Sequence, residues 1–234
     1  MNPEFIALGF LWYVVFLFSL TCHEASHALA AQWGGDLTAA AGGQVTLNPL
    51  PHIRRELFGT VIVPIISYAL GGWMIGWGSA PYDPLWRNRH PRRAAWMALA
   101  GPTANLVLML AAAAGIRIGI LAGALTEPGA ARFTRVATAA HAGPLEGLAT
   151  LLSIMFSLNL MLMLFNLLPI PPLDGHGAIC LFFTEGFARR FAEATRNPSF
   201  AILGLVVSWK IFGYIYDPLF TLALNLLYPG AGYR

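Results

Sequence analysis

Two histidines and a glutamate form the pattern H-E-x-x-H at the end of the first long apolar stretch, at His23, Glu24 and His27. Residues four apart lie on one face of a helix, so His23 and His27 can present two imidazole nitrogens to one zinc ion. Glu24 is then placed to accept a proton from a water molecule on that ion. Ionisable groups in a membrane span are costly unless they have a function. The alternative is that these polar groups only hydrogen-bond to each other at the watery end of a span.

A catalytic zinc site needs a third protein ligand, and Asp174 is the strongest candidate. It follows Pro169, Pro171 and Pro172, which prevent a regular helix, and it precedes Gly175, which permits an unusual backbone angle. Irregular backbone at membrane depth is tolerated only where protein buries it or where it lines a cavity. We therefore expect a broken helix that directs Asp174 into a polar site. In the alternative, Asp174 only caps the next helix.

Two amide side chains within apolar stretches are further candidates. Asn166 can donate a hydrogen bond to a substrate carbonyl or its oxyanion, or it can satisfy carbonyls that the prolines leave free. Asn105 follows the small residues of Ala-Gly-Pro-Thr-Ala in the third apolar run. It can line the site, or it can hydrogen-bond between closely packed helices.

The elements that position these residues must lie in a membrane, because the chain has too little charge for a water-facing surface. Charged residues make up 11% of the 234 residues and hydrophobic residues 57%, and the mean hydropathy is +0.62. A soluble domain has about 25% charged residues. These figures also exclude a disordered, coiled-coil or collagen-like chain. No basic stripe with interleaved aromatic residues is present, so we expect the lipid bilayer and no nucleic acid as a partner.

Long uncharged runs predict an all-α polytopic membrane protein, since a spanning helix needs about 20 mostly apolar residues. The runs cover residues 5–22, 57–82, 94–116, 147–173, 175–184 and 198–228. They predict five or six transmembrane helices in a single domain, 1–234. Pro64 and the pair Gly71–Gly72 interrupt the second run and permit a turn at membrane depth, so we expect this run to re-enter or to make a tight double pass.

Basic residues in short connectors predict the orientation, because cytoplasmic loops carry an excess of Lys and Arg. The basic connectors contain Arg54 and Arg55, the cluster 87–93, and Arg189 and Arg190. If these connectors are cytoplasmic, the N-terminus lies outside and His23 lies near the cytoplasmic side.

Together the motifs resemble the site-2 protease family of intramembrane zinc metalloproteases, peptidase family M50. The first motif extends over His23–Ala30, with Gly35 and Asp36 shortly after. The second is the family's Asn-x-x-Pro followed by Leu-Asp-Gly, at Asn166, Pro169 and Leu173–Gly175. Val45–Leu50 and the stretch that ends at Asn105 also look like short bacterial members without a PDZ or CBS domain. The resemblance covers about residues 16–177.

The resemblance implies an enzyme that cleaves transmembrane helices of other proteins within the bilayer. One zinc ion would be bound by His23, His27 and Asp174, with Glu24 as the base. Many members act in regulated intramembrane proteolysis, on substrates first shortened by a site-1-type protease. We therefore expect an integral protein of the bacterial inner membrane, with its active site near the cytoplasmic side.

A short membrane-associated β segment is predicted at Gln44, Val45, Thr46 and Leu47, which Gly and Pro residues bound on the two sides. A substrate helix hides its carbonyl groups in its own hydrogen bonds, so it must unwind before attack. This segment is predicted to pair with the unwound substrate, as in strand addition to a sheet edge.

Two other functions compete with proteolysis. A pseudoprotease would bind helices without cutting them, but its usual mark, the loss of the glutamate or of a histidine, is absent from this sequence. A membrane metal transporter would also have intramembrane His, Glu and Asp residues. The sequence shows one such cluster and no inverted repeat, which argues against transport.

Overall fold

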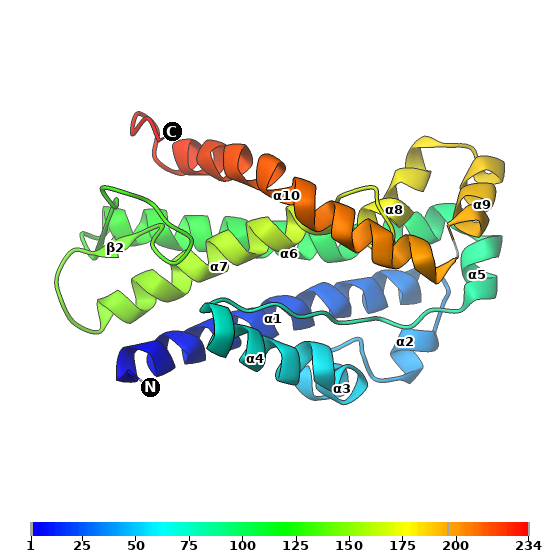
Figure 1. Cartoon of the computed structure of the whole chain (residues 1–234), viewed down its shortest axis with the longest axis horizontal. Coiled ribbons are helices and arrows are strands. Elements are labelled where there is room, and N and C mark those ends of the chain that lie inside the picture. Colours follow the sequence, from blue (N-terminus) through cyan, green and yellow to red (C-terminus); the bar gives the residue numbers. More distant parts are fainter. Residues whose placement is uncertain (1, 196, 234) are drawn as a thin grey trace.

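The computed structural model describes residues 2–195 and 197–233, and four long helices dominate it (Figure 1). These are α1 (Pro3–Trp33), α6 (Pro91–Leu121), α7 (Leu145–Asn166) and α10 (Pro198–Leu227). Each is long and apolar enough to cross a bilayer. The prediction of an all-α polytopic membrane protein is thus confirmed. The predicted number of five or six spanning helices is wrong for the described residues, because the runs 57–82 and 175–184 form only short elements.

Several helices begin at an Asn-Pro or Asp-Pro pair, and the local sequence explains why. Asn2 precedes α1, Asn48 precedes α3 (Pro49–Arg55), Asp83 precedes α5 (Pro84–Arg89) and Asn197 precedes α10. In each case the side-chain oxygen accepts a hydrogen bond from the backbone N–H two residues further on. The proline that follows has a backbone angle suited to the first helical position and no N–H to leave unpaired.

The core of the bundle lies where α1, α6 and α7 pack together (Figure 1). Trp12 and Phe16 of α1 are buried against Ile154 and Leu158 of α7. A second cluster joins α6 and α7 to the C-terminal part of α10, where Leu224 is buried. These three central helices carry both histidines and the amides near them, so their packing sets the geometry of the site.

The second apolar run goes out as a short helix and comes back as extended chain. A π-helical turn (Phe58–Ile62) leads into α4 (Val63–Gly71), which ends at Gly72 in the left-handed conformation with φ +73°. Glycine adopts this conformation without steric cost. The returning chain runs alongside, and Trp77 N–H donates to the Gly59 carbonyl at 3.1 Å. This path agrees with the prediction that the run turns back.

The predicted strand at Gln44–Leu47 is wrong. These residues form an irregular link with bends at 45–47, between the short helix α2 (Thr38–Ala41) and α3, and neither strand of the part of the chain that the structure describes pairs with them. The hydroxyl of Thr46 accepts from Asn48 N–H, and the Thr46 carbonyl oxygen lies 3.1 Å from His52 Nε2, so local contacts use these polar groups. The prediction that the four residues contact a substrate stays a prediction.

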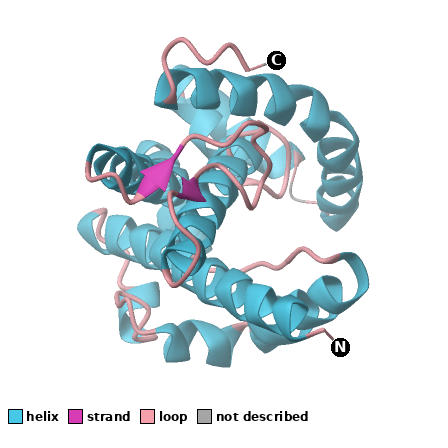
Figure 2. Cartoon of the chain, turned by 90° about the vertical axis from the view of Figure 1, so that its left-hand side faces the viewer, coloured by secondary structure: helices cyan, strands magenta, loops and turns pink. Residues whose placement is uncertain are grey.

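The described strands lie in the loop between α6 and α7. They are β1 (Leu125–Thr126) and β2 (Thr138–Ala139), which pair antiparallel (Figure 2). This hairpin lies at the end of the bundle opposite α5 and α9 (Figure 1).

The predicted broken helix is present. α7 ends at Asn166, residues 167–173 are irregular with a cis Pro171–Pro172 bond, and α8 (Asp174–Ala178) begins at the aspartate. A 3-10 turn (Ile179–Phe182) and α9 (Glu185–Ala194) follow.

The reason predicted for Gly175 was wrong, because its φ is not positive. Space requires glycine there instead. A Cβ atom at this position would lie 2.2 Å from the Leu167 carbonyl oxygen.

Candidate metal centre

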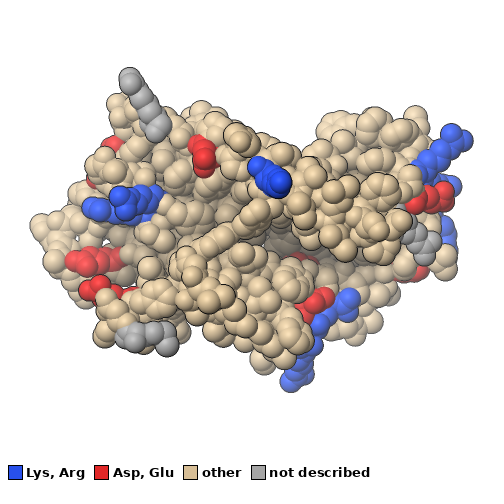
Figure 3. Space-filling view, in the orientation of Figure 1, with Lys and Arg blue, Asp and Glu red and all other residues tan. Residues whose placement is uncertain are grey.

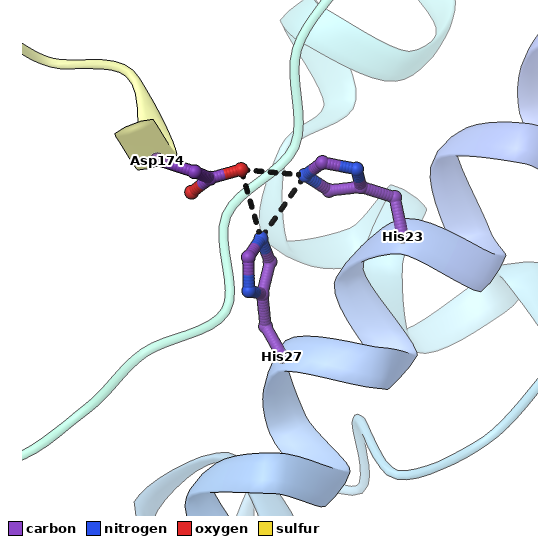
Figure 4. A group of neighbouring side chains, drawn as sticks. All are labelled: His23, His27 and Asp174. Carbon is purple, nitrogen blue, oxygen red and sulfur yellow. Dashed lines mark hydrogen bonds and ion pairs between the residues drawn. The ribbon is translucent and has the colours of Figure 1, made fainter. Parts of the chain in front are cut away.

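Two turns of α1 and the first residue of α8 meet at one point in the bundle (Figure 4). Oδ2 of Asp174 lies 3.1 Å from Nε2 of His23 and 3.2 Å from Nε2 of His27. The two Nε2 atoms lie 3.0 Å apart. Both imidazoles are buried, with 5% and 6% of His23 and His27 exposed. The structure therefore brings together the three residues predicted as ligands.

The histidines approach α6 closely because a glycine faces them. A Cβ atom on Gly101 would lie 2.3 Å from Nε2 of His27 and 2.5 Å from Nε2 of His23. Any side chain at this position would therefore fill the point at which the three ligand atoms meet. From sequence, Gly101 was predicted only to allow close packing of helices.

Hydrogen bonds on the far side of each ring define which nitrogen faces the site. Nδ1 of His27 lies 2.7 Å from the Met97 carbonyl oxygen, and Nδ1 of His23 lies 2.6 Å from Oδ1 of Asn105. Both oxygens can only accept a hydrogen bond, so each Nδ1 carries its ring's hydrogen. Each Nε2 therefore directs a lone pair into the site.

Three electron-pair donors thus face one another with no proton donor between them. Oδ2 of Asp174 is buried and has no hydrogen-bond partner. A cation removes the mutual repulsion of such groups. Tetrahedral zinc with bonds of about 2.0–2.1 Å places its ligand atoms about 3.3 Å apart, close to the spacing observed here. Two histidines and one carboxylate also match the donor set of catalytic zinc sites, so the residues fit the metal.

The charge of Asp174 suits the same role. A carboxylate binds a metal in its ionised form, and neutral imidazoles bind it through a free lone pair. Oδ2 of Asp174 faces the two Nε2 atoms and can provide the negative charge that balances part of the charge of a bound cation.

Glu24 lies beside the ligands on α1 and is 5% exposed. The extended segment Trp73–Asp83 passes directly over it. A Cβ atom on Gly78 would lie 2.7 Å from Cγ and 2.8 Å from Oε1 of Glu24. The backbone at Gly78 therefore covers the carboxylate predicted to be the base, and a glycine is required for this approach.

Polar contacts hold the extended segment in place. The Ser79 hydroxyl donates to Glu56 and accepts from Nε of Arg55, and Nε2 of Gln44 lies 3.5 Å from the Ser79 carbonyl oxygen. Gln44 is buried, so its role in the structure is to support this segment.

The far end of the extended segment is anchored by Asp36. Its carboxylate accepts from Thr38 and from the backbone N–H of Asp83. Burial alone would raise the pKa of Asp36, but these hydrogen bonds outweigh burial and lower it below its usual value. The ionised carboxylate thus fixes both the start of α2 and the end of the segment over Glu24.

The two candidate amides differ in their positions. Asn105 is fully buried, and its amide is occupied by His23 and by Asn159 of α7. Asn166 lies in the last turn of α7, where its Nδ2 donates to the Leu162 carbonyl at 3.0 Å, outside the group of three ligands. Asn159 was not among the residues predicted from sequence, although an amide in an apolar run is itself a signal of function.

Membrane-length helices surround two histidines and an aspartate, and a glutamate lies beside them. This combination is typical of membrane metallopeptidases. Comparison with known sequences shows which family of this class the chain belongs to. The model of Peptidase family M50 matches residues 11–209. The chain belongs to peptidase family M50, and it is a metalloendopeptidase.

Several bacterial proteins are similar over most of their length. "Putative zinc metalloprotease YwhC" of Bacillus subtilis (strain 168) is 31% identical over 230 residues, which cover 88% of this chain and 92% of the relative. "Putative zinc metalloprotease Rip2" of Mycolicibacterium smegmatis is 33% identical, covering 86% of this chain and 68% of the relative. Its counterpart in Mycobacterium tuberculosis (strain H37Rv) is 31% identical, covering 88% and 70%. No solved structure gives a significant match.

Proposed function

We propose that this protein is an intramembrane zinc protease that hydrolyses peptide bonds in or near the transmembrane helices of other proteins. The observation that carries the proposal is the convergence of His23, His27 and Asp174 inside a bundle of membrane-length helices, with Glu24 next to His23 in the same turn of α1. A protease whose metal-binding residues lie among its membrane-spanning helices is accessible to substrates that lie in the same bilayer. The names of the bacterial relatives agree with zinc as the metal.

The roles of the residues follow from their positions. His23, His27 and Asp174 would bind zinc through Nε2, Nε2 and Oδ2. When bound, zinc would act as a Lewis acid: it would polarise the scissile carbonyl and make a water molecule easier to deprotonate, and therefore a better nucleophile. Glu24 would accept the proton of the attacking water and then donate it to the leaving nitrogen, which is general base followed by general acid catalysis. Its carboxylate lies in a buried site, where bulk water does not compete for that proton.

Asn166 is proposed as a donor to the oxyanion that develops on the substrate carbonyl. One N–H of its amide is bonded to the Leu162 carbonyl oxygen, and an amide carries a second N–H. A donor aimed at developing charge contributes about 10²–10³ in turnover at comparable sites. Regulated intramembrane proteolysis, with a site-1-type protease that shortens the substrate first, is the proposed setting.

Cleavage by the purified protein tests the proposal. The detergent-solubilised protein is incubated with a panel of transmembrane helices, and the products are identified by mass spectrometry. We expect cut peptides from the untreated protein, none after treatment with a zinc chelator, and recovery of cleavage when zinc is restored. Binding of helices without any product from zinc-loaded protein would favour a pseudoprotease instead.

We further propose that the metal centre lies near the cytoplasmic side of a bacterial inner membrane. On the face in Figure 3 the charged groups are few and lie mostly toward the two ends and the lower edge, with one acidic and one basic group in the upper middle. The elements α5 and α9, each of which carries two arginines, lie at the same end of the bundle as α8 (Figure 1). They contain the pairs Arg87 and Arg89, and Arg189 and Arg190. Because short cytoplasmic loops carry excess positive charge, this end is proposed to face the cytoplasm.

Labelling of single cysteines tests this orientation. We expect a membrane-impermeant maleimide to label Ala142→Cys, in the loop before α7, on intact cells. Arg190→Cys on α9 should react only after the membrane is opened, because its side chain faces the cytoplasm. The native Cys22 and Cys180 are both buried, so the unmodified chain should give little background. The reverse labelling pattern would place the centre on the outer side.

A further inference from the structure

A circuit of fully buried side chains connects His23 to the two neighbouring helices. Nδ1 of His23 lies 2.6 Å from Oδ1 of Asn105 on α6, and Nδ2 of Asn105 donates to Oδ1 of Asn159 on α7 at 2.8 Å. Nδ2 of Asn159 donates to the Ser19 hydroxyl on α1 at 2.9 Å. Ser19 and His23 are four residues apart, on one face of α1. The hydrogen bonds thus leave α1 through α6 and α7 and return to it one turn away.

One backbone carbonyl gives this circuit a direction. Nδ2 of Asn159 also donates to the Met155 carbonyl oxygen, one turn earlier on α7, at 2.8 Å. A carbonyl oxygen can only accept, so the NH₂ end of Asn159 must lie on this side. Oδ1 of Asn159 then faces Asn105 and requires an N–H from it. The oxygen of Asn105 is left to face His23, where it requires a hydrogen on Nδ1.

We propose that Asn159 is a positioning residue for the metal ligand His23. By holding the Asn105 amide in one orientation, it selects the imidazole tautomer whose Nε2 has a free lone pair. If the amide turned over, its N–H groups would face Nδ1 and would favour hydrogen on Nε2, the atom that must bind the metal. The described hydrogen bonds of Asn159 reach Asn105, Ser19 and Met155 and none of the three proposed ligands, so we assign its effect on His23 to Asn105. This inference rests on the proposed role of His23 as a zinc ligand.

His27 needs no such relay, which explains why the circuit serves only one ligand. Its Nδ1 is bonded directly to the Met97 carbonyl oxygen, which cannot turn over. The Asn105 amide beside His23 can in principle present either its oxygen or its NH₂ group to the imidazole. The hydrogen bond with Asn159 fixes which of the two faces His23.

Zinc affinity of the full-length protein tests the proposal. The protein is purified in detergent, stripped of metal, and titrated with zinc against a chromophoric chelator. Asn159→Leu has a similar volume but no polar atoms, so the Asn105 amide is free to turn. We expect zinc binding to weaken about 10- to 100-fold, the usual effect of losing a partner that orients a ligand. The visible absorption of the Co²⁺-loaded variant should also change, because the geometry at His23 changes.

The conservative variant Asn159→Asp separates orientation from packing. A carboxyl group kept neutral by burial keeps an accepting oxygen for Asn105 and one O–H that can donate to the Met155 carbonyl, and it loses only the second donor, which faces Ser19. We expect its zinc affinity and Co²⁺ spectrum to stay close to those of the wild type. If Asn159→Leu does not fold, Asn159→Ala removes the same hydrogen bonds without crowding and gives the same comparison.

Ser153→Ala is the matched control. Ser153 lies on the same helix, is fully buried, and accepts from the N–H groups of Val136 and Ala137 away from the metal centre. Its loss should lower stability and leave zinc affinity unchanged. Equal zinc affinity of Asn159→Leu and Ser153→Ala, or an aspartate variant as weak as the leucine variant, would overturn the proposal. If the wild type binds no zinc, or if His23→Ala binds it as tightly, the proposed function itself fails.

Discussion

Glu24→Gln is expected to reduce the cleavage of transmembrane helices by about 10²–10⁴-fold, the usual contribution of a general acid or base. The amide has nearly the shape of the carboxylate but cannot accept the proton of the attacking water. Glu24 is not among the three side chains whose ligand atoms converge, so the variant should retain its zinc. The measurement is the rate of product formation under single-turnover conditions, together with zinc content by atomic absorption.

Glu4→Gln is the control for this experiment. Glu4 lies in the first turn of the same helix and is exposed, so its loss should change the rate little. If Glu24→Gln cleaved as fast as Glu4→Gln, Glu24 would not be the base. Loss of zinc from Glu24→Gln would instead show that the glutamate supports the metal centre.

Asp174→Asn is expected to abolish activity by a different route, through the loss of the metal. The substitution keeps the shape of the side chain and removes the negative charge that faces two neutral imidazoles. The zinc affinity should fall by more than about 100-fold, the upper effect of residues that only orient a ligand. Excess zinc should restore part of the cleavage, whereas it should not rescue Glu24→Gln. Zinc titration and cleavage at rising zinc concentration measure both effects.

Asp83→Asn provides the matched control. Asp83 caps α5 by accepting from Leu85 N–H, and asparagine caps a helix as well as aspartate does. This variant should keep wild-type zinc affinity and activity. Zinc affinity that is the same in Asp174→Asn and Asp83→Asn would remove Asp174 from the ligand set.

The main features of the fold and the site could be predicted because they depend on local sequence. The spacing of His23 and His27 places them on one helix face by geometry alone. Three prolines within a stretch of four residues before Asp174 prevent a regular helix, so the irregular segment follows from residue types, whereas single prolines such as Pro102 are accommodated inside a long helix. Composition was sufficient for the class of fold, since so little charge can cover only a surface that faces lipid.

Other features depend on which helices become neighbours, which the sequence does not state. Asn105 was predicted either to line the site or to join helices, and its partners His23 and Asn159 are known only once α1, α6 and α7 are packed. The strand predicted at Gln44–Leu47 failed because a strand needs a neighbour to pair with. The requirement for glycine at position 101 is equally invisible in sequence, because it comes from two histidines of another helix.

The distance along the chain between the ligands has a consequence for biosynthesis. Asp174 follows His27 by 147 residues, and α6 and α7 are synthesised between them. When α1 is inserted into the membrane, Asp174 has therefore not yet been synthesised, and the two histidines lack the carboxylate that faces them in the folded protein. A nascent or prematurely terminated chain lacks the proposed third ligand, so the proposed function gives it no proteolytic capacity. The order of synthesis thus prevents proteolytic activity in the membrane until α1, α6 and α7, the helices that surround the site, have all been made.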